Sequence, residues 1–420
     1  MIPLPMENRM RRRGRAARLA AVLALMAMPL ATQAAPPEPL ALVNAQVVDV
    51  RAGRVTPATV VLRDGRIESV GPGGPPAGTK TLDLRGRHLV PGLVDAHTHI
   101  ASLDAAKRAL ESGVTTVRSS GVSHFTDVGL RELVRQGAVP GPDMLASGYH
   151  VRPRLAEGAF LGDPSLASLL AGGLRTPDDV RRAVRANLTR GVDWIKVLAT
   201  ERAGLPDTDP RKQALTEEEL RAAVEEAGRV PVQAHAHGDE GARAAVRAGV
   251  RSIEHGTYLS AETLALMSER GVFFVPTFTT VMDLVEPGGD YDIPLLRNRG
   301  RHMLPRLRGA VSQARQKGVK IVTGADTGYG PDSLTRIAHE VAALAELGLT
   351  PVEALQAATL TAAEMLRLDG KIGAVEPGLE ADLIAVEGNP LADPAALQDV
   401  LLVVSNGRVA LDRLDFAPRR

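Results

Sequence analysis

The middle of the chain alternates between strand and helix patterns, and this alternation limits the possible folds more than any other feature. Between residues 91 and 365, short apolar runs are followed by amphipathic segments that carry helix-capping signals. One unit begins its helix at Thr176-Pro177, ends it before Gly191 and continues into a strand. The eight predicted strands lie at about residues 90–96, 114–118, 144–147, 193–198, 230–234, 250–254, 272–275 and 319–323.

Consecutive strand–helix units in this number predict an α/β fold of the (β/α)8 type, a TIM barrel. An open, doubly wound sheet is the alternative, and it is disfavoured because no glycine-rich phosphate loop follows the first strand. Barrel enzymes carry their active sites at the C-terminal ends of the strands. We therefore expect functional residues at these ends.

The two ends of the chain have the pattern of β-structure. Asp64-Gly65 and Asn406-Gly407 are strong hairpin signals, and each lies between two apolar, strand-like runs. Because both ends share this pattern, we expect one small β-sandwich domain built from both termini. The predicted parts are residues 35–90 (β-sandwich, N-terminal part), residues 91–365 (barrel) and residues 366–420 (β-sandwich, C-terminal part).

The first 34 residues have the three-part pattern of a secretory signal peptide. A basic cluster over residues 9–18 precedes an apolar run over residues 19–30, and small residues follow at 31–35. The apolar run is short for a membrane span, although an N-terminal membrane anchor is the alternative. We expect cleavage of residues 1–34, a secreted or periplasmic protein, and no stable membrane anchor in the mature chain.

The composition excludes several classes of function. The 420-residue chain has no Cys, which excludes disulfides, thiolate metal sites and a cysteine nucleophile. Its formal net charge of +1 includes the leader, whose six Arg and one Glu contribute +5. The mature chain would carry −4, so no excess of basic residues indicates a nucleic-acid partner.

Residue types that bind metals are concentrated at the ends of the predicted strands. His97 and His99 follow the first strand, where residues two apart face the same side. Half of the ten His in the chain lie at such ends. Histidines with unrelated structural roles would not be concentrated there. The other residues at or near strand ends are Lys196, His235, His237, His255 and Asp326.

This residue set fits a hydrolytic metal centre. Four His and an Asp can hold one or two divalent ions and leave open positions for water. A buried, unpaired Lys196 would be costly, but a carbamate formed on it from CO2 is an anion that can bridge two metals. The alternative is an ion pair of Lys196 with Asp193 or Asp326. His237 is either a substrate contact or an exposed loop residue.

The combined motifs resemble the metal-dependent amidohydrolase superfamily. Within it, the chain is similar to the imidazolonepropionase-like branch, which includes binuclear zinc dipeptidases acting on Xaa-Pro or Xaa-Arg/Lys and N-acyl amino acid hydrolases. The resemblance covers nearly the whole mature chain. The matching segments are residues 91–99, 113–118, 195–197, 235–238, 253–256, 323–327 and 378–384.

The resemblance implies a role for each candidate ligand. Imidazolonepropionases lack the lysine of strand four, so Lys196 favours the binuclear, peptidase-like group. One departure is Ser119-Ser120, where relatives often have Asp after the Arg of strand two. By resemblance, His97, His99 and Asp326 bind the buried metal, His235 and His255 bind the exposed metal, and carbamylated Lys196 bridges two divalent ions, with Zn²⁺ as the default.

The same resemblance implies a mechanism. Two metals would lower the pKa of a bridging water, and the resulting hydroxide would attack the amide carbonyl. Asp326 would take up the proton and deliver it to the leaving nitrogen, and His150 would stabilise the tetrahedral oxyanion. Tyr258, His237 and Arg152 are the candidate substrate contacts; a loop hydrogen bond for Tyr258 and a solvated Arg152 are the alternatives.

We therefore expect a secreted amidohydrolase that cleaves the amide bond of dipeptides or N-acyl amino acids by a metal-bridged hydroxide. The first alternative is a cyclic amide, lactone or ester hydrolase with the same metal centre. The second is a non-catalytic metal-binding protein. The expected partner is a small-molecule or dipeptide substrate, and a homo-oligomer is expected because such relatives often form rings.

Overall fold

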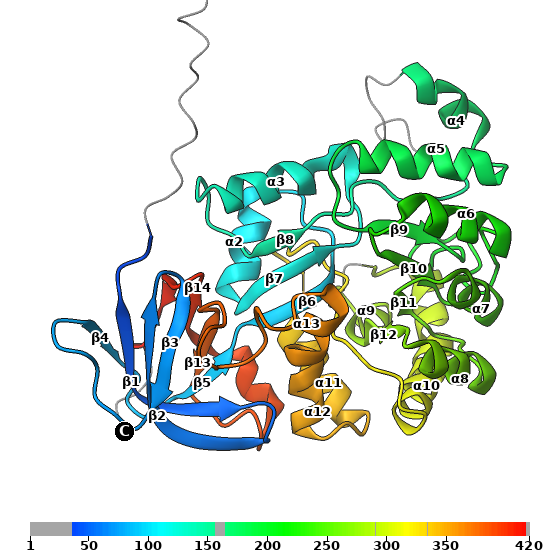
Figure 1. Cartoon of the computed structure of the whole chain (residues 1–420). Coiled ribbons are helices and arrows are strands. Elements are labelled where there is room, and N and C mark those ends of the chain that lie inside the picture. The colour runs from blue at the N-terminus through cyan, green and yellow to red at the C-terminus, as the bar shows by residue number, and fades with distance from the viewer. Residues whose placement is uncertain (1–35, 156–163, 290, 334, 417–420) are drawn as a thin grey trace, which may run out of the picture. The chain divides into compact units, whose positions relative to one another are not determined.

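Parallel strands in the middle of the chain form two short sheets (Figure 1). The computed structural model describes residues 36–155, 164–289, 291–333 and 335–416, which belong to one compact unit, Pro36–Arg420. The predicted signal peptide lies outside the described residues. One sheet has the order β6-β7-β8 and the other β12-β11-β10-β9. The strand bounds are β6 (Leu93–Thr98), β7 (Val114–Ser119), β8 (Asp143–Leu145), β9 (Ile195–Leu198), β10 (Val232–Ala236), β11 (Ser252–His255) and β12 (Phe273–Val275).

Backbone hydrogen bonds join the two sheets into a ring. Val151, which follows β8, donates its amide to the carbonyl of Lys196 in β9 at 2.8 Å. On the other side, Phe274 of β12 pairs with Ile321 in a parallel bridge. Asp326 then donates its amide to the carbonyl of His97 at 2.8 Å, which returns the ring to β6. This closed arrangement, with the β domain described below, confirms the predicted barrel with a β-sandwich domain.

The eighth member of the ring differs from the predicted strand at 319–323. It forms isolated bridges and no regular strand. The reason is a contact with a distant part of the chain, because the amide of Thr323 donates to the carbonyl of Ala357 and so leaves the strand ladder. A Cβ atom at the next residue, Gly324, would lie 2.7 Å from Cβ of His97. The backbone at Gly324 therefore lies in close contact with β6.

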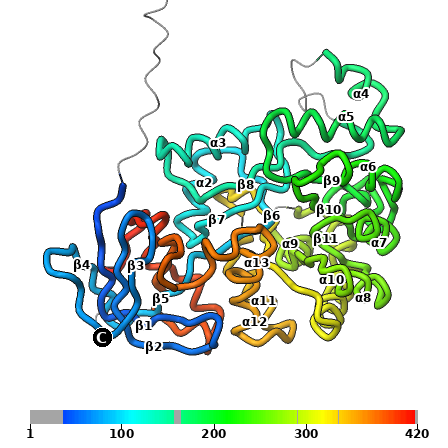
Figure 2. The backbone as a smooth tube through the Cα atoms, in the orientation of Figure 1, coloured from blue at the N-terminus to red at the C-terminus, as the bar shows by residue number. Residues whose placement is uncertain are grey.

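Helices alternate with the barrel strands along the chain, so each strand-to-strand connection crosses over through a helix or a long loop (Figures 1 and 2). A capping box begins α6, with Thr216 and Glu219 bonded reciprocally. The helix bounds are α2 (Leu103–Glu111), α3 (Thr126–Arg135), α4 (Ala167–Gly172), α5 (Pro177–Leu188), α6 (Glu217–Ala227), α7 (Asp239–Ala248), α8 (Ala261–Arg270), α9 (Phe278–Asp283), α10 (Pro294–Gln316), α11 (Ile337–Glu346), α12 (Pro351–Ala357) and α13 (Leu360–Leu366), with 3₁₀ turns η1 (Ser123–Phe125), η3 (Pro164–Leu166) and η4 (Pro394–Gln398).

The β domain combines both ends of the described chain. Its main strand order is β15-β14-β13-β5-β1-β2-β3, and β4 pairs with β1. In Figure 1, the blue N-terminal strands thus share a sheet with the red C-terminal strands. The bounds are β1 (Leu40–Asp49), β2 (Arg54–Arg63), β3 (Arg66–Gly71), β4 (Lys80–Asp83), β5 (His88–Pro91), β13 (Leu383–Val386), β14 (Val400–Ser405) and β15 (Arg408–Asp412).

The sequence pattern predicts one strand that begins at about residue 90. In the structure, Gly92 divides this stretch between the two domains. Residues 88–91 form β5 of the β domain, where they pair with β1 and β13. The barrel strand β6 begins only at Leu93. A Cβ atom at Gly92 would lie 2.1 Å from Oγ1 of Thr115, so only glycine fits where the chain crosses.

Three carboxyl groups meet where the β domain contacts the barrel. Asp143 at the start of β8, Glu380 and Asp382 have oxygen atoms within 4.8 Å of one another. Oδ1 of Asp382 accepts the backbone amide of Asn406 at 2.8 Å. Burial, with the nearby charge of Asp143, raises the pKa of Asp382 to about 8.

In the described part of the chain, no helix has the length and apolar character needed to cross a membrane.

Replacing Asp382 with Asn is expected to remove part of the pH dependence of stability. The carboxyl loses its proton near pH 4 in the unfolded chain but near pH 8 in the folded protein. The wild-type free energy of unfolding should therefore fall, relative to Asp382→Asn, as the pH rises from about 4 to about 8. Urea denaturation across this range measures the difference. Asp64→Asn, an exposed turn residue, is the matched control, and parallel pH curves for wild type and Asp382→Asn would contradict the expectation.

Candidate metal centre

Histidine, lysine and aspartate side chains converge at the C-terminal ends of the barrel strands. They line a cavity of about 40 Å³. His97 lies in β6, Lys196 in β9, His235 in β10 and His255 at the end of β11. All the predicted metal ligands thus come together, and the candidate residues that line the cavity are His97, His99, His150, Lys196, His235, His237, His255 and Asp326.

His97 is oriented by a buried ion pair beneath the cavity. Its Nδ1 lies 2.7 Å from Oε2 of Glu254, and the same oxygen accepts from Nη2 of Arg118 at 2.7 Å. Glu254 and Arg118 are fully buried, and the Arg118 guanidinium packs 4.7 Å from the centroid of the Trp194 ring. A carboxylate only accepts hydrogen bonds, so Nδ1 carries the proton and Nε2 presents its lone pair to the cavity.

His99 and Asp326 are arranged as metal ligands would be. Nδ1 of His99 lies 2.7 Å from the carbonyl oxygen of Gly121, so Nδ1 donates and Nε2 is an acceptor. Nε2 of His99 lies 3.0 Å, and Nε2 of His97 3.4 Å, from Oδ1 of Asp326. These three acceptors repel one another unless a cation or proton lies between them. Ligands about 2.1 Å from a tetrahedral Zn²⁺ are about 3.4 Å apart, which fits these distances.

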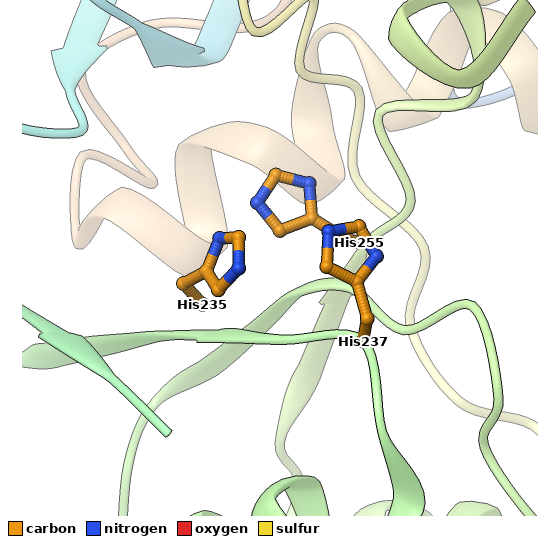
Figure 3. Close-up of side chains that lie close together, drawn as sticks. All are labelled: His235, His237 and His255. Carbon is orange, nitrogen blue, oxygen red and sulfur yellow. The ribbon is translucent and has the colours of Figure 1, made fainter. Parts of the chain in front are cut away.

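A second cluster consists of His235, His237 and His255, whose rings lie close together (Figure 3). One ring nitrogen from each lies within 4.8 Å of the others. Burial lowers the pKa of all three imidazoles, to about 3 for His237, so they are neutral at pH 7 and able to bind a metal. His255 also groups with His97 and Asp326, so it joins the two clusters. The predicted substrate contact His237 therefore has the position of a possible ligand.

Lys196 lies in the cavity with only 2% of its surface exposed. Its Nζ is 3.5 Å from Nε2 of His97. Burial lowers the pKa of this amine to about 8, which increases the neutral form that reacts with CO2. The alternative partner Asp193 instead pairs with Arg131 at 2.5 Å.

The backbone conformation at the strand ends orients two of these side chains. His255 and Asp326 have left-handed φ angles of 73° and 48°, which are costly for residues with a Cβ atom. Asp95 fixes this region, because its Oδ1 accepts the backbone amides of His97 and Ala325 at 3.1 and 3.0 Å. The first and eighth members of the ring are thereby tied together beside the site.

His150 lies beside His99, with the two ring centroids 5.9 Å apart. Its Nε2 is 2.7 Å from the carbonyl oxygen of Ser120, so this nitrogen donates. Burial, followed by the effects of His99 and Lys196, lowers the pKa of His150 well below its usual value. In the neutral ring, Nδ1 can only accept, so the predicted stabilisation of an oxyanion needs a second proton on this ring.

The other two predicted substrate contacts lie farther from the ligands. Tyr258 is half-buried, and its ring centroid is 5.9 Å from that of His302. Arg152 donates to the hydroxyl of Tyr149 at 3.1 Å and lines a neighbouring cavity together with His99. Neither side chain lines the metal cavity itself.

A sequence model of the amidohydrolase family matches residues 88–410, more than half of the chain. The chain belongs to the amidohydrolase family. This confirms the resemblance inferred from the motifs. Amidohydrolases are metal-dependent, and this one has His and Asp clusters that can bind a metal.

Individual relatives place this amidohydrolase more closely. It is 29% identical to ochratoxinase from Aspergillus niger over 350 residues, which cover 74% of this chain and 72% of that enzyme. It is 28% identical to imidazolonepropionase from Symbiobacterium thermophilum over 376 residues, covering 77% and 82% of the two chains. Among solved structures, it is similar to a Xaa-Pro dipeptidase with bound methionine, with a TM-score of 0.79, 29% identity and coverage of 89% and 99%. The protein is thus a hydrolase of carbon–nitrogen amide or peptide bonds.

Sequence reasoning missed the supporting residues of this amidohydrolase site. Arg118 and Glu254 are the last residues of two predicted barrel strands, and a charged residue there is the signal that a buried ion pair exists. Arg202 also lines the metal cavity, in a loop whose sequence contains no recognised motif.

The variant Glu254→Gln is expected to weaken both folding and metal binding. Without Glu254, the buried Arg118 charge is unpaired, which costs about 3–5 kcal/mol of the free energy of unfolding. Loss of the carboxylate that orients His97 should weaken Zn²⁺ binding about 10- to 100-fold. Chelator competition measures the affinity, and Glu262→Gln at an exposed site is the control. Wild-type metal affinity in folded Glu254→Gln would contradict this role.

Proposed function

We propose that this amidohydrolase cleaves the amide bond of dipeptides or N-acyl amino acids at a binuclear metal site. The observation that carries the proposal is the convergence of Nε2 of His97, Nε2 of His99 and Oδ1 of Asp326. This group lies next to the cluster of His235, His237 and His255. The names of two relatives, a Xaa-Pro dipeptidase and an ochratoxinase, support amide substrates.

The donor set fits two divalent ions, for which Zn²⁺ is the first candidate. Neutral imidazoles and a carboxylate are ligands that Zn²⁺ prefers. When bound, the ions would supply an acidified water and would polarise the substrate carbonyl. His97, His99 and Asp326 would hold one ion, His235 and His255 the other, and a carbamate on Lys196 would contact both.

Asp326 is the residue proposed to move the proton. Burial raises the pKa of its carboxyl, but the neighbouring imidazoles of His97 and His99 lower that pKa below its usual value. Asp326 is therefore ionised at neutral pH and can accept a proton from the attacking water. Because it is a weak base, it returns that proton readily to the leaving nitrogen.

The remaining roles follow from position. His150 would act on the oxyanion only in its doubly protonated form, while His237 is close enough to the ligands to contact the scissile group. Tyr258 and Arg152 would contact more distant parts of a substrate. From the leader pattern we also propose export to the periplasm or the medium, and from the resemblance a homo-oligomer.

Metal removal and the variant Asp326→Asn test this function. Dialysis against a chelator should abolish release of free amino acids from a panel of dipeptides and N-acyl amino acids, and Zn²⁺ or Mn²⁺ should restore it. Asp326→Asn should lower kcat by about 100- to 10,000-fold while most of the metal stays bound. Asp332→Asn, an exposed neighbour, is the control. Unchanged turnover in Asp326→Asn would refute the proton transfer, and cleavage of only lactones, esters or cyclic amides would favour the alternative hydrolase.

A carbamate on Lys196 has a direct spectroscopic test. Protein that is loaded with metal in the presence of ¹³C-bicarbonate should give a carbamate carbon signal in its NMR spectrum. Lys196→Ala should lose this signal, whereas Lys107→Ala, at an exposed helical position, should keep it. A wild-type spectrum without the signal would contradict the bridging role.

A further inference from the structure

A second cavity, of about 220 Å³, lies beside the metal cavity and shares three side chains with it. His99, His150 and Arg202 line both cavities. A substrate whose amide bond is held at the metal ligands can thus extend past Arg202 into this side cavity. The other residues that line the side cavity are Gly121, Val122, Ser123, Tyr149 and Arg152.

Arg202 is a partly buried cation whose guanidinium has no hydrogen bond or ion pair with any other residue in the described ranges. Its side chain lines the metal cavity. Burial is the main cause that lowers the pKa of His150, His235 and His237. The positive charge of Arg202 lowers these pKa values further. A partly buried guanidinium without an acidic partner is stabilised when an anion binds it.

The side cavity has a second guanidinium and no acid to balance either one. Among the described residues, no Asp or Glu lines it. Arg152 donates one hydrogen bond to Tyr149, but its buried Nε has no hydrogen-bond partner in the described structure. Donors of this kind match the two oxygens of a carboxylate.

The loop that carries Arg202 is held in place by a second arginine. Arg299 of α10 donates to backbone carbonyls of four loop residues. This tether holds the loop around Arg202 before substrate arrives, which reduces the entropy that binding must cost. The four carbonyls belong to Ala203, Leu205, Pro206 and Thr208.

We propose that Arg202 binds a carboxylate of the amino acid released by hydrolysis, and that the side cavity holds this half of the substrate. The inference rests on the proposed function, since it assigns one side of the cleaved bond to this cavity. Arg202 is then a specificity-determining residue that favours substrates with an acidic leaving half. The carboxylate is either the α-carboxylate or that of a Glu or Asp side chain, and both offer the same chemistry.

Matched substrate pairs separate these two sources. Ala-Pro and its C-terminal amide differ in the α-carboxylate, while Ala-Glu and Ala-Gln differ in the side-chain carboxylate. Wild type should prefer the acid in at least one pair. Arg202→Met should raise KM for that acid about 10- to 100-fold with little change in kcat, and should lose the preference. Arg202→Lys should keep part of it, and Arg211→Met, an exposed neighbour in the same loop, should behave as wild type.

Equal preference for the acid in wild type and Arg202→Met would overturn the inference. A binding measurement keeps it testable if the proposed function fails and no dipeptide is cleaved. Calorimetry on metal-loaded protein should show proline or glutamate binding more tightly than the corresponding amide. Arg202→Met should weaken the binding of the acid about tenfold or more. Equal affinity in the two proteins, or no carboxylate binding by wild type, would also overturn it.

Discussion

The buried ion pair between Arg118 and Glu254 is the interaction on which the rest of the site depends. It brings a full charge from β7 and one from β11 into the barrel interior, where neither is stable alone. Glu254 then fixes the proton of His97, and the lone pair of Nε2 faces the cavity as a result. The barrel thus uses one desolvated pair both to tie its two sheets together and to orient a candidate metal ligand.

Strand periodicity and strand order explain why the predicted metal-binding residues line one cavity. His97 and His99 face one way since they lie two apart, and parallel strands bring His235 and His255 to the same end of the barrel. The confirmed barrel and β-sandwich follow from the same patterns. These rules use only local sequence and the direction of each strand.

Other features depend on contacts between remote segments, and local patterns do not record these. The strand pattern at residues 319–323 fails because Thr323 bonds to Ala357, outside the ladder. The domain boundary at Gly92 lies within a continuous apolar run, so the sequence pattern does not indicate it. Arg202 lies at the cavity because Arg299 holds the loop that carries it. Arg299 is nearly a hundred residues away from this loop in the chain.

The mixed sheet of the β domain has a consequence for biosynthesis. β5 leads through Gly92 directly into the first barrel strand, but its partner β13 lies close to the other end of the chain. Arg87 and Glu387, which pair across this sheet, are 300 residues apart. During synthesis, the edge of β5 that pairs with β13 therefore stays unpaired until almost the entire polypeptide has emerged. During this interval the unpaired edge can associate with other chains, which favours aggregation.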